Sequence, residues 1–453
     1  MLTASPKQLM APGPHGYDLL KKVRGFYRDP LAMFAEVASR YGGIARLELG
    51  PYCLHLITRP EHMKYVLEDN IDNYPKAGAY QHTRPVLGLG LATNSTETWR
   101  RQRQWVEPVF HYGRLAKFTS VITAAAADML EDWQVFARNG AAVNVWSELL
   151  QLNHRILGQV LFGVELPILQ ALRTVRDISA RRINALLTIP DTIPTPDNRR
   201  FQKAVAELDA FVYRLIGERR QAPGEEVLSI LIRARDKGTG EAMTDVQLHD
   251  EIMSLLFSGY EDPTNALTWA LYLLVQHPGI ENRLRSELQM VLQGRPPTLP
   301  DLAQLPYLTM VLQETMRLYP PSWGILRDVV ADDKVGGYHL PAGSTVFLAA
   351  YLTHRLPALW PDPDVFDPTR FTPEQSAARP DYAYFPFGGG PRRCIADDFA
   401  MLEIKVTLAT MIQTYQFHLA IERPVETEAL HSLRPRQGLL MTLQLSENTH
   451  DGH

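Results

Sequence analysis

Helical periodicity dominates the chain between Trp99 and about Gly294, and this stretch constrains the fold more than any other feature. Apolar residues recur there at spacings of three and four, as they do along one face of a helix. The segments with this pattern are 99–107, 113–137, 146–162, 166–185, 199–219, 226–236, 244–277 and 279–293, and further helices are expected at 306–319 and 395–415. We therefore predict a mainly α-helical protein with minor β structure.

The β structure is expected mainly outside this helical stretch. Residues 44–57 alternate apolar and polar side chains around Gly50-Pro51, which is typical of a β-hairpin. Short strands are predicted at 323–330, 345–350 and 438–445, and the Pro- and Gly-rich residues 355–393 should be irregular. The pattern predicts one large domain over residues 1–453, with a mixed part at about 30–98, a helical core at 99–320 and a C-terminal part with small sheets at 321–453.

The segment 244–277 is expected to form one long helix, about 50 Å at 1.5 Å per residue. Thr244 and Gln247 have the spacing of a capping box at its start, and Pro278 marks its end. The second half of the segment is apolar on nearly all sides, so a path through the interior is favoured over one along the surface.

The composition argues against several classes of protein. A net charge of −4 disfavours general nucleic-acid binding, which requires a basic face. Cys53 and Cys394 are the only cysteines, so neither a disulfide framework nor a multi-cysteine metal site is expected, and a reducing, cytoplasmic compartment is favoured. The N-terminal residues hold no apolar run typical of a signal peptide, and the longest nearly apolar run, 266–275, is too short for a membrane span of ~20 residues.

The stretch from Phe385 to Phe399, FPFGGGPRRCIADDF, places Cys394 behind three glycines and two arginines. A lone cysteine is most often a small buried hydrophobe. A cysteine at a helix start beside arginines, however, has its thiolate stabilised by amide donors and positive charge, and glycines let the backbone approach a flat partner closely. Such a thiolate would be a nucleophile or a metal ligand, and no His–Cys signature for a nucleophile is evident.

Four short motifs, at residues 387–394, 314–317, 368–371 and 99–103, together resemble those of the cytochrome P450 enzymes. Phe387, Gly390, Arg392 and Cys394 fit the haem-binding pattern F-x-x-G-x-R-x-C. The other motifs are E-x-x-R at Glu314 and Arg317, P-x-R-F at Pro368, Arg370 and Phe371, and W-x-x-x-R at Trp99 and Arg103. One E-x-x-R pair is nearly always a surface ion pair, but four motifs in order at family-like separations are not expected by chance. The resemblance extends from about residue 30 to 445.

The resemblance implies that the protein binds haem b, iron protoporphyrin IX, with Cys394 as the proximal ligand of the iron. Thiolate ligation favours cleavage of the O–O bond, and amides of the glycine loop that donate toward sulfur keep it ionised. Partners for the haem propionates are implied at Arg392, Trp99, Arg103 and Arg327. The other haem contacts assigned in this way are Pro386, Phe387, Gly388, Ile395 and Ala396, and the last stands where the family usually has glycine.

The same resemblance assigns Glu314, Arg317 and Arg370 to a buried triad that maintains the fold and the haem pocket and takes no part in the chemistry. Removing one partner of a buried ion pair costs ~3–5 kcal/mol, which is a large share of the stability of an ordinary domain.

The long helix departs from the family pattern at residues 258–265, SGYEDPTN. Asp262 stands where the family has the threonine that steers protons to bound oxygen, and Pro263, which lacks an amide hydrogen, follows it. Thr264 should lie roughly opposite residue 262 on a helix, whereas Asn265 lies nearer the same face. We therefore predict Asp262 as a proton donor, with Glu261 raising its pKa and Asn265 orienting it or a water. Drift at a tolerant position and a proton donor on the substrate are the alternatives.

These features predict a haem-thiolate monooxygenase of the soluble bacterial type that inserts one oxygen atom of O2 into a mid-sized lipophilic substrate. Its electrons would come from separate ferredoxin and ferredoxin-reductase proteins, and Arg100, Arg101 and Arg393 are candidates for a cationic docking patch. Neither a nucleic-acid partner nor a transmembrane anchor is expected. Two alternatives stay open. One is a haem-thiolate enzyme that uses peroxide, isomerises or dehydrates, and the other is a haem-based sensor, which would be expected to carry an output domain.

Overall fold

The computed structural model of the protein describes residues 9–50, 52–94, 97–183, 189–190, 192–421 and 424–446. These residues form two compact units. The described residues of unit 1 come from the segments Met1–Gln81, Arg317–Val365 and Pro373–Cys394, and those of unit 2 come from His82–Met316, Phe366–Thr372 and Ile395–His453. Helices predominate and the strands are short, so the predicted mainly α fold with minor β structure is confirmed.

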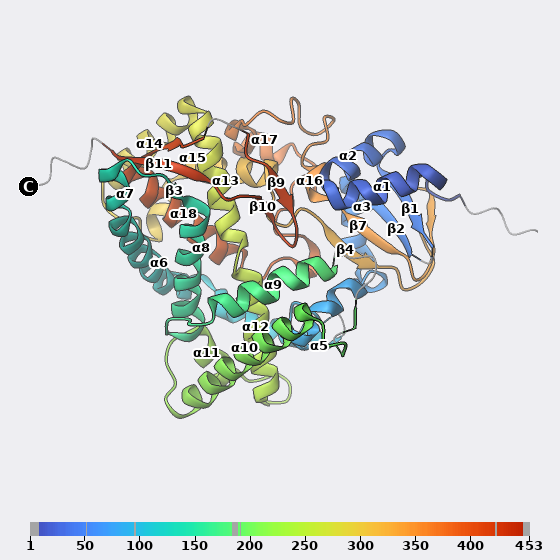
Figure 1. Ribbon diagram of the computed structural model, residues 1–453, viewed down its shortest axis with the longest axis horizontal. Coiled ribbons are helices and arrows are strands. Elements are labelled where there is room, and N and C mark those ends of the chain that lie inside the picture. The colour runs from blue at the N-terminus through green and yellow to red at the C-terminus, as the bar shows by residue number, and fades with distance from the viewer. Residues whose placement is uncertain are drawn as a thin grey trace, which may run out of the picture. The chain divides into compact units, whose positions relative to one another are not determined.

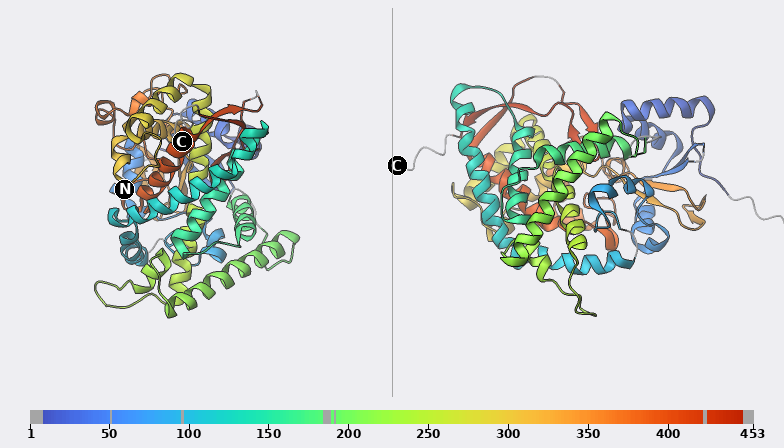
Figure 2. Two further views of the ribbon diagram at one scale, coloured as in Figure 1. Left: turned by 90° about the vertical axis from the view of Figure 1, so that its left-hand side faces the viewer. Right: turned by 60° about the horizontal axis from the view of Figure 1, so that its bottom comes forward.

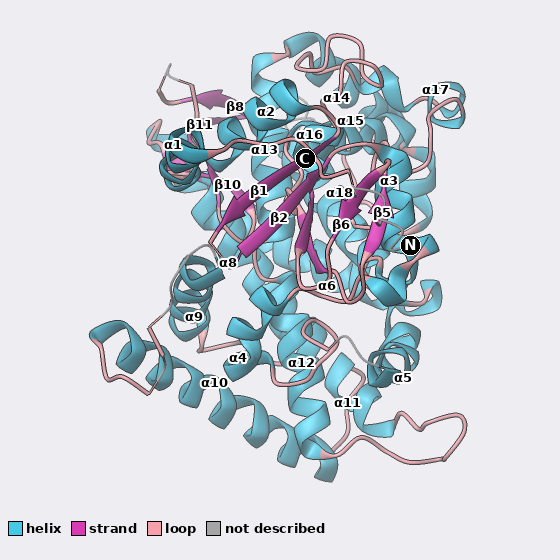
Figure 3. Cartoon of the chain, turned by 90° about the vertical axis from the view of Figure 1, so that its right-hand side faces the viewer, coloured by secondary structure: helices cyan, strands magenta, loops and turns pink. Residues whose placement is uncertain are grey.

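A four-stranded sheet organises unit 1 (Figure 3). Its strands lie in the order β1 (Ile44–Leu49), β2 (Tyr52–Ile57), β7 (Thr345–Leu348) and β4 (Ile325–Asp328). β1 and β2 form the predicted antiparallel hairpin, β2 runs parallel to β7, and β4 runs antiparallel to β7. The predicted strands at 323–330 and 345–350 are thus confirmed as β4 and β7, and β4 carries Arg327 in the sheet.

Short helices and a second hairpin complete unit 1. The helices are α1 (Gly16–Arg28), α2 (Pro30–Tyr41), α3 (Pro60–Lys64), α16 (Ala350–Thr353) and α17 (Pro373–Ala377), with the short η1 (Tyr65–Asp69), η2 (Ile71–Asn73) and η8 (Gly390–Arg392). Strands β5 (Asp333–Val335) and β6 (Tyr338–Leu340) form the hairpin. Apolar side chains of the sheet, α3 and η1 share one buried core with Phe385, which fixes the start of the Cys394 loop.

Helices, several of them long, make up most of unit 2 (Figures 1 and 2). They are α4 (Arg84–Leu87), α5 (Glu97–Val106), α6 (Tyr112–Asp132), α7 (Gln134–Asn139), α8 (Val145–Leu157), α9 (Leu169–Ile183), α10 (Pro196–Gln221), α11 (Val227–Arg233), α12 (Asp245–Gly259), α13 (Asp262–Gln276), α14 (Pro278–Leu292), α15 (Pro306–Leu318, whose last two residues belong to unit 1) and α18 (Asp397–Thr414). Within the described residues, no helix combines the length and the apolar character that a membrane crossing requires.

The core of unit 2 lies where α6, α8, α13 and α18 pack against one another. α13 and α18 are apolar on most sides, as the sequence suggested for the second half of the 244–277 segment, and Trp269 at the middle of α13 is fully buried. α9 packs along α10, and α10 also contacts α12. This arrangement places the end of α12 and the start of α13 next to residues of α8 and α9. The candidate site lies at this junction of α12 and α13.

Two small sheets belong to unit 2. β3 (Val143–Asn144), β11 (Leu440–Leu445) and β8 (Tyr415–Leu419) form one antiparallel sheet, which confirms the strand predicted at 438–445. β9 (Thr427–Ala429) and β10 (Leu433–Pro435) form a separate hairpin. The sequence analysis did not assign this hairpin, because strands of three residues are too short to show an alternating pattern.

Two predicted helices differ from the structure in their extent. The segment 113–137 divides at Trp133 into α6 and α7. The segment 166–185 begins later, at Leu169, and its end at 184–185 lies outside the described residues. The largest difference concerns 244–277, which is interrupted at the candidate site.

Candidate active site

In unit 1, the loop from Phe385 to Cys394 presents the thiol that the sequence analysis selected. The Phe385 amide donates a hydrogen bond to Nε2 of His354 at 3.0 Å, which anchors the buried start of the loop. At the other end, the Cys394 amide donates to the carbonyl oxygen of Phe387 at 2.9 Å. The Cys394 side chain is exposed, so a thiolate here is accessible to a metal ion.

Two glycines set the path of this loop. Gly388 and Gly390 have φ values of +72° and +62°, which L side chains rarely adopt. A Cβ atom at Gly390 would also lie 2.0 Å from the backbone oxygen of Leu67, so the close packing against η1 requires glycine. The two glycines therefore allow the loop a backbone conformation that other residues rarely adopt. Cys394 lies at the end of this loop.

Arg327 of β4 is a buried cation. Its side chain is 5% exposed, and its Nη1 donates to the carbonyl oxygen of Leu326 at 3.0 Å. Burial lowers the pKa of the guanidinium group. Among the described residues no carboxylate forms an ion pair with Arg327, although a buried charge normally requires an anionic partner. The site thus favours an anion that the described residues do not supply. Arg392, in the same unit, is half-buried at the end of η8.

In unit 2, α5 carries the predicted Trp99 and Arg103 one turn apart. Trp99 is buried, and the guanidinium carbon of Arg103 lies 5.9 Å from the centre of its indole ring. The sequence analysis placed Arg101 in a docking patch. In the structure Arg101 forms ion pairs with Asp236 at 2.7 Å and Glu241 at 2.8 Å. Its charge is therefore already balanced within unit 2, which argues against a role in docking.

The predicted site residues divide between the two units. Unit 1 holds Arg327, Pro386, Phe387, Gly388, Arg392 and Cys394, and unit 2 holds Trp99, Arg103, Glu261, Asp262, Asn265, Ile395 and Ala396. Ile395 and Ala396 are half-buried at the start of α18, where the Ala396 carbonyl accepts the amide of Ala400 at 2.9 Å. The methyl group of Ala396 therefore sits at the N-cap of a regular helix.

Two members of the predicted triad, Glu314 and Arg317, are fully buried, and the side chain of Arg370 is 12% exposed. Within unit 2, Glu314 is fully buried, lies 3.4 Å from Nε of Arg370 and accepts the amide of Asp367 at 3.0 Å. Within unit 1, the fully buried Arg317 donates to the carbonyl oxygens of His354 at 2.9 Å and Pro363 at 2.7 Å. These contacts with backbone groups agree with a structural role.

The helix expected over 244–277 is broken, so that prediction is wrong in its middle. α12 starts with the predicted capping box of Thr244 and Gln247 but ends at Gly259, and α13 starts at Asp262. Glu261, between them, has φ −129° and ψ −26°, outside the helical region. Pro263 explains the break, because it has no amide hydrogen for the carbonyl of Gly259 and its ring clashes with that carbonyl.

Asn153 of α8 compensates for the break. Its Nδ2 donates to the carbonyl oxygens of Gly259 at 2.9 Å and Tyr260 at 2.5 Å. Both carbonyls would otherwise lack the partners that a continuous helix supplies, which is costly in the interior. A side chain about a hundred residues earlier in the chain therefore stabilises the non-helical geometry at Glu261.

Replacing Asn153 with alanine is expected to lower the free energy of unfolding by about 1–3 kcal/mol, because two buried carbonyls lose their donor. Chemical denaturation followed by circular dichroism measures this change. The exposed Asn282 of α14 is the matched control, and Asn282→Ala should change stability by less than ~0.5 kcal/mol. Equal effects of the two substitutions would show that Asn153 does not support the break.

Glu261 is held by two arginines from other elements. Its carboxylate accepts Nη2 of Arg176 in α9 at 3.1 Å and Nη1 of Arg434 in β10 at 3.2 Å. Arg434 also pairs with Glu428 at 3.0 Å, and the pKa of Arg434 is raised by these carboxylates against the opposing effect of burial. The side chains of Glu261 and Arg176 are nearly fully buried, at 7% and 3% exposed. Glu261 thus joins α9, the helix break and the β9–β10 hairpin.

Asp262 is half-buried at the first position of α13. Burial raises the pKa of its carboxyl to about 6, against the opposing effect of the Arg176 charge. Thr264 turns away, as predicted, and its hydroxyl donates to the carbonyl oxygen of Leu149 at 3.4 Å. Asn265 is fully buried, and its two polar atoms contact Trp146 and Ser432, so it does not bind Asp262 directly.

The sequence analysis missed the residues that surround Asp262 and Glu261. They are Trp146 and Asn153 in α8, Arg176 in α9, and Ser432 and Arg434 in or beside the β9–β10 hairpin. No local pattern marks them, since each is ordinary in its own segment and lies far from residue 262 in the chain. The one available signal was Pro263, whose missing hydrogen bond implies a compensating donor somewhere in the fold.

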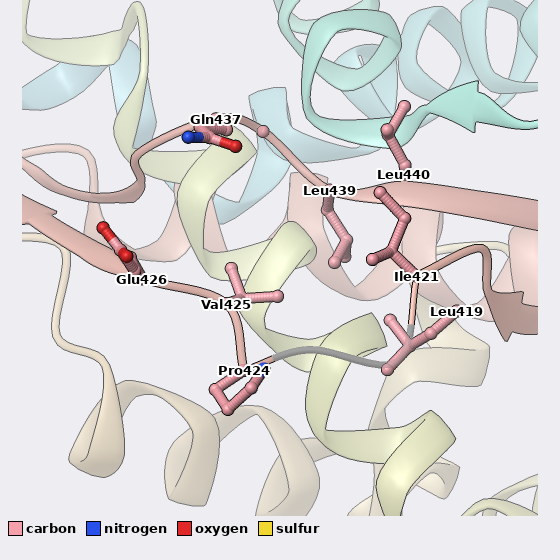
Figure 4. A pocket seen from close by; sticks show the side chains of 9 residues that line it. Leu419, Ile421, Pro424, Val425, Glu426, Gln437, Leu439 and Leu440 are labelled. Atoms are coloured by element: carbon pink, nitrogen blue, oxygen red, sulfur yellow. The ribbon is translucent and has the colours of Figure 1, made fainter.

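A separate cavity of about 110 Å³ lies in unit 2, lined by described residues of 419–421, 424–426 and 437–440 (Figure 4). Its lining combines the apolar side chains of Leu419, Ile421, Val425, Leu439 and Leu440 with Glu426 and Gln437 at one side. None of the predicted site residues lines this cavity, so it is distinct from the candidate site at the helix break.

Comparisons with known proteins agree with the motifs. The family model described as Cytochrome P450 matches residues 14–442. Cyclooctatin synthase of Streptomyces melanosporofaciens is 34% identical over 446 residues, which cover 96% of this chain and 94% of that protein. Cyclooctat-9-en-7-ol 5-monooxygenase of the same organism is 32% identical over 411 residues, covering 89% and 88%. The solved structure of retinoic acid bound cyanobacterial CYP120A1 matches with a TM-score of 0.86 at 28% identity, covering 97% of this chain and 100% of that one.

The match with the family extends over nearly the whole chain, and two relatives exceed 30% identity. The resemblance carried by the four short motifs is therefore confirmed, and so is the predicted fold. The chain belongs to the cytochrome P450 family, whose members named here include a monooxygenase, and it is an enzyme of that oxygenase type.

Proposed function

We propose that the protein inserts one oxygen atom of O2 into a mid-sized lipophilic substrate, with electrons delivered by separate ferredoxin-type proteins. The observation that carries this proposal is the half-buried Asp262 carboxyl at the break between α12 and α13. Reductive activation of O2 consumes protons, and the carboxyl stands where other members of the family have a hydroxyl. The name of one relative, which describes a monooxygenase acting on the unsaturated alcohol cyclooctat-9-en-7-ol, supports a lipophilic substrate.

The residues that the motifs select suit haem, the cofactor that membership of the family implies. The exposed thiol of Cys394 would ligate the iron, and the buried Arg327, which has no carboxylate partner among the described residues, would donate hydrogen bonds to a propionate. The other proposed contacts are Trp99, Arg103, Pro386, Phe387, Gly388, Arg392, Ile395 and Ala396. When bound through a thiolate, haem supplies the activation and cleavage of the O–O bond.

In this proposal Asp262 donates the proton. Burial raises the pKa of its carboxyl to about 6, so about one carboxyl in ten is protonated at pH 7 and ready to donate. Glu261, which two arginines hold, keeps the helix break in place. Asn265 does not bind the Asp262 carboxyl directly, since its polar atoms bind Trp146 and Ser432.

A second candidate is a haem-thiolate enzyme that uses peroxide or that isomerises or dehydrates its substrate. The observation that favours it is Asp262-Pro263 in place of the usual threonine, because such reactions do not require a proton relay for O2. The two candidates differ in whether turnover requires a reductant and in where the product's oxygen atom comes from.

Isotopic labelling is expected to decide between them. Lipophilic alcohols and hydrocarbons that shift the haem spin state identify a substrate, which is then turned over with ferredoxin, its reductase and NADPH under ¹⁸O2. We expect product to form only with the reductant and to gain one ¹⁸O atom, as mass spectrometry measures. Product formed at an equal rate from peroxide alone, or product without labelled oxygen, would contradict the first candidate and support the second.

A further inference from the structure

A second cavity of unit 2, about 280 Å³ in volume, is lined by residues of α5, α6, α11 and the segment 234–237 that follows α11. Its apolar lining includes Trp105 of α5, Ile230 of α11 and Pro108. Neither the predicted haem contacts nor the residues of the helix break line this cavity, so it is separate from the candidate active site. Its volume suits a small ligand, because pockets for drug-sized molecules measure ~300–1,000 Å³.

Trp105 brings an uncommitted hydrogen-bond donor to the cavity. The residue is 5% exposed, and its Nε1 atom is buried without a hydrogen-bond partner among the described residues. A buried indole N–H usually has an acceptor, because leaving the bond unmade costs the desolvation of the group. An acceptor atom on a ligand in the cavity would satisfy this N–H.

Four cationic side chains line the cavity, those of Arg114, Arg233, Arg235 and Lys237. In the described part of the chain none of them forms an ion pair. Nη1 of Arg233 and Nη1 of Arg235 donate instead to backbone carbonyl oxygens, at 2.9 Å and 2.8 Å. These contacts orient the two guanidinium groups and leave their charge unbalanced.

The carboxylates of this region already have cations of their own. Asp236, which also lines the cavity, pairs with Arg101 at 2.7 Å. Glu225 pairs with Lys117 at 2.8 Å. The hydrogen bond and charge of Lys117, followed by the charges of Arg233 and Arg114, lower the pKa of Glu225. Both carboxylates are thus neutralised mainly by residues outside the lining, and an excess of positive charge remains around the cavity.

We propose that this cavity binds a small organic anion, in which a carboxylate or phosphate group is attached to a compact apolar body. The apolar body packs against Trp105, Pro108 and Ile230, and the indole N–H of Trp105 donates to an oxygen of the charged group. The four cations balance the charge of that group, as arginine and lysine commonly do for carboxylates and phosphates. This second site goes beyond the proposed oxygenation and does not depend on it.

Isothermal titration calorimetry of the haem-bound protein, in a buffer without phosphate, tests this proposal. The probes are phenyl phosphate and benzoate, which carry the two charged groups, inorganic phosphate, which lacks the apolar body, and benzyl alcohol, which lacks the charge. Each titration is repeated with imidazole saturating the haem iron, so that a ligand at the iron does not contribute. The carbonyl Soret band shows that each variant has folded and holds haem.

Two variants and two matched controls assign the binding to the cavity. Trp105→Phe removes the indole N–H and keeps an aromatic ring, and Lys237→Gln removes one charge from an exposed side chain. Trp133→Phe is the control for the first, since Nε1 of Trp133 donates to Glu148 at 3.4 Å. Lys203→Gln, at an exposed position of α10, is the control for the second. Neither control residue lines the cavity.

We expect phenyl phosphate or benzoate to bind at one site with imidazole present, and the tighter of the two identifies the charged group. Inorganic phosphate and benzyl alcohol should bind roughly tenfold more weakly. Trp105→Phe should weaken binding of the aromatic anion about tenfold, Lys237→Gln about threefold, and the controls should leave it unchanged.

Three results would overturn the proposal. They are no binding of either aromatic anion, equally tight binding of inorganic phosphate, and an affinity that Trp105→Phe and Lys237→Gln both leave unchanged. Lys237 is exposed and forms no hydrogen bond or ion pair within the described residues, so Lys237→Gln tests the site even if Trp105→Phe does not fold.

Discussion

Replacing Cys394 with alanine is expected to abolish turnover and to remove the strongly red-shifted Soret band that thiolate ligation gives to the reduced carbonyl complex. The thiol is exposed at the end of a loop that Gly388 and Gly390 fix, so no neighbouring atom of that loop replaces the sulfur as a soft ligand. Absorption spectroscopy of the purified, reduced protein under carbon monoxide measures the loss directly.

Cys53 is the matched control for this substitution. It lies in β2, where it pairs with Glu48 of β1 and its sulfur accepts Nε of Arg46 at 3.4 Å. Cys53→Ala should therefore leave the carbonyl spectrum and turnover unchanged. If Cys394→Ala kept the red-shifted band, or if Cys53→Ala lost it, the assignment of the iron ligand to Cys394 would be wrong.

Replacing Asp262 with alanine or asparagine is expected to lower coupled turnover by roughly 10²-fold, the contribution of a well-placed general acid. Substrate binding and reduction should be unaffected, so the electrons should appear as hydrogen peroxide. Asp262→Thr restores the hydroxyl found in the family and should keep coupled activity. Product and peroxide formed per NADPH consumed measure the effect.

Asp177→Asn is the control for the Asp262 variants, because it neutralises a carboxyl of α9 that lies 3.8 Å from Nη1 of Arg434 and is 40% exposed. It should leave the ratio of product to NADPH unchanged. Tightly coupled turnover in Asp262→Ala would contradict the role of Asp262 as proton donor. It would indicate a donor on the substrate or chemistry that needs no relay.

The helical core and the Cys394 loop could be predicted because their signals are local. Apolar spacing marks the long helices, and the motif around Cys394 is contiguous in sequence. α2 also had a local signal that the sequence analysis did not use: Asp29 caps its start, accepting the amide of Ala32 at 3.0 Å, and Pro30 follows. Such a capping residue with proline at the first helical position is typical of a helix start.

The surroundings of Asp262 could not be predicted, because they depend on how distant segments pack. Pro263 disfavours a regular helix, but the donors that Asn153 supplies to the carbonyls of Gly259 and Tyr260 come from a distant segment. Likewise the sequence placed Asn265 near Asp262 on one helix face, yet Trp146 and Ser432 take up its amide in the fold. Tertiary hydrogen bonds of this kind leave no periodic trace in the sequence.

The pH dependence of coupling tests the central claim most directly. Burial raises the pKa of Asp262 to about 6, so the protonated, donating form is present below pH 6 and is lost as the pH rises through that value. We therefore expect the ratio of product to NADPH in the wild-type protein to be highest below pH 6 and to fall above it, and the ratio in Asp262→Asn to be low and independent of pH. A wild-type ratio that rises with pH, or an identical profile in Asp262→Asn, would contradict the account.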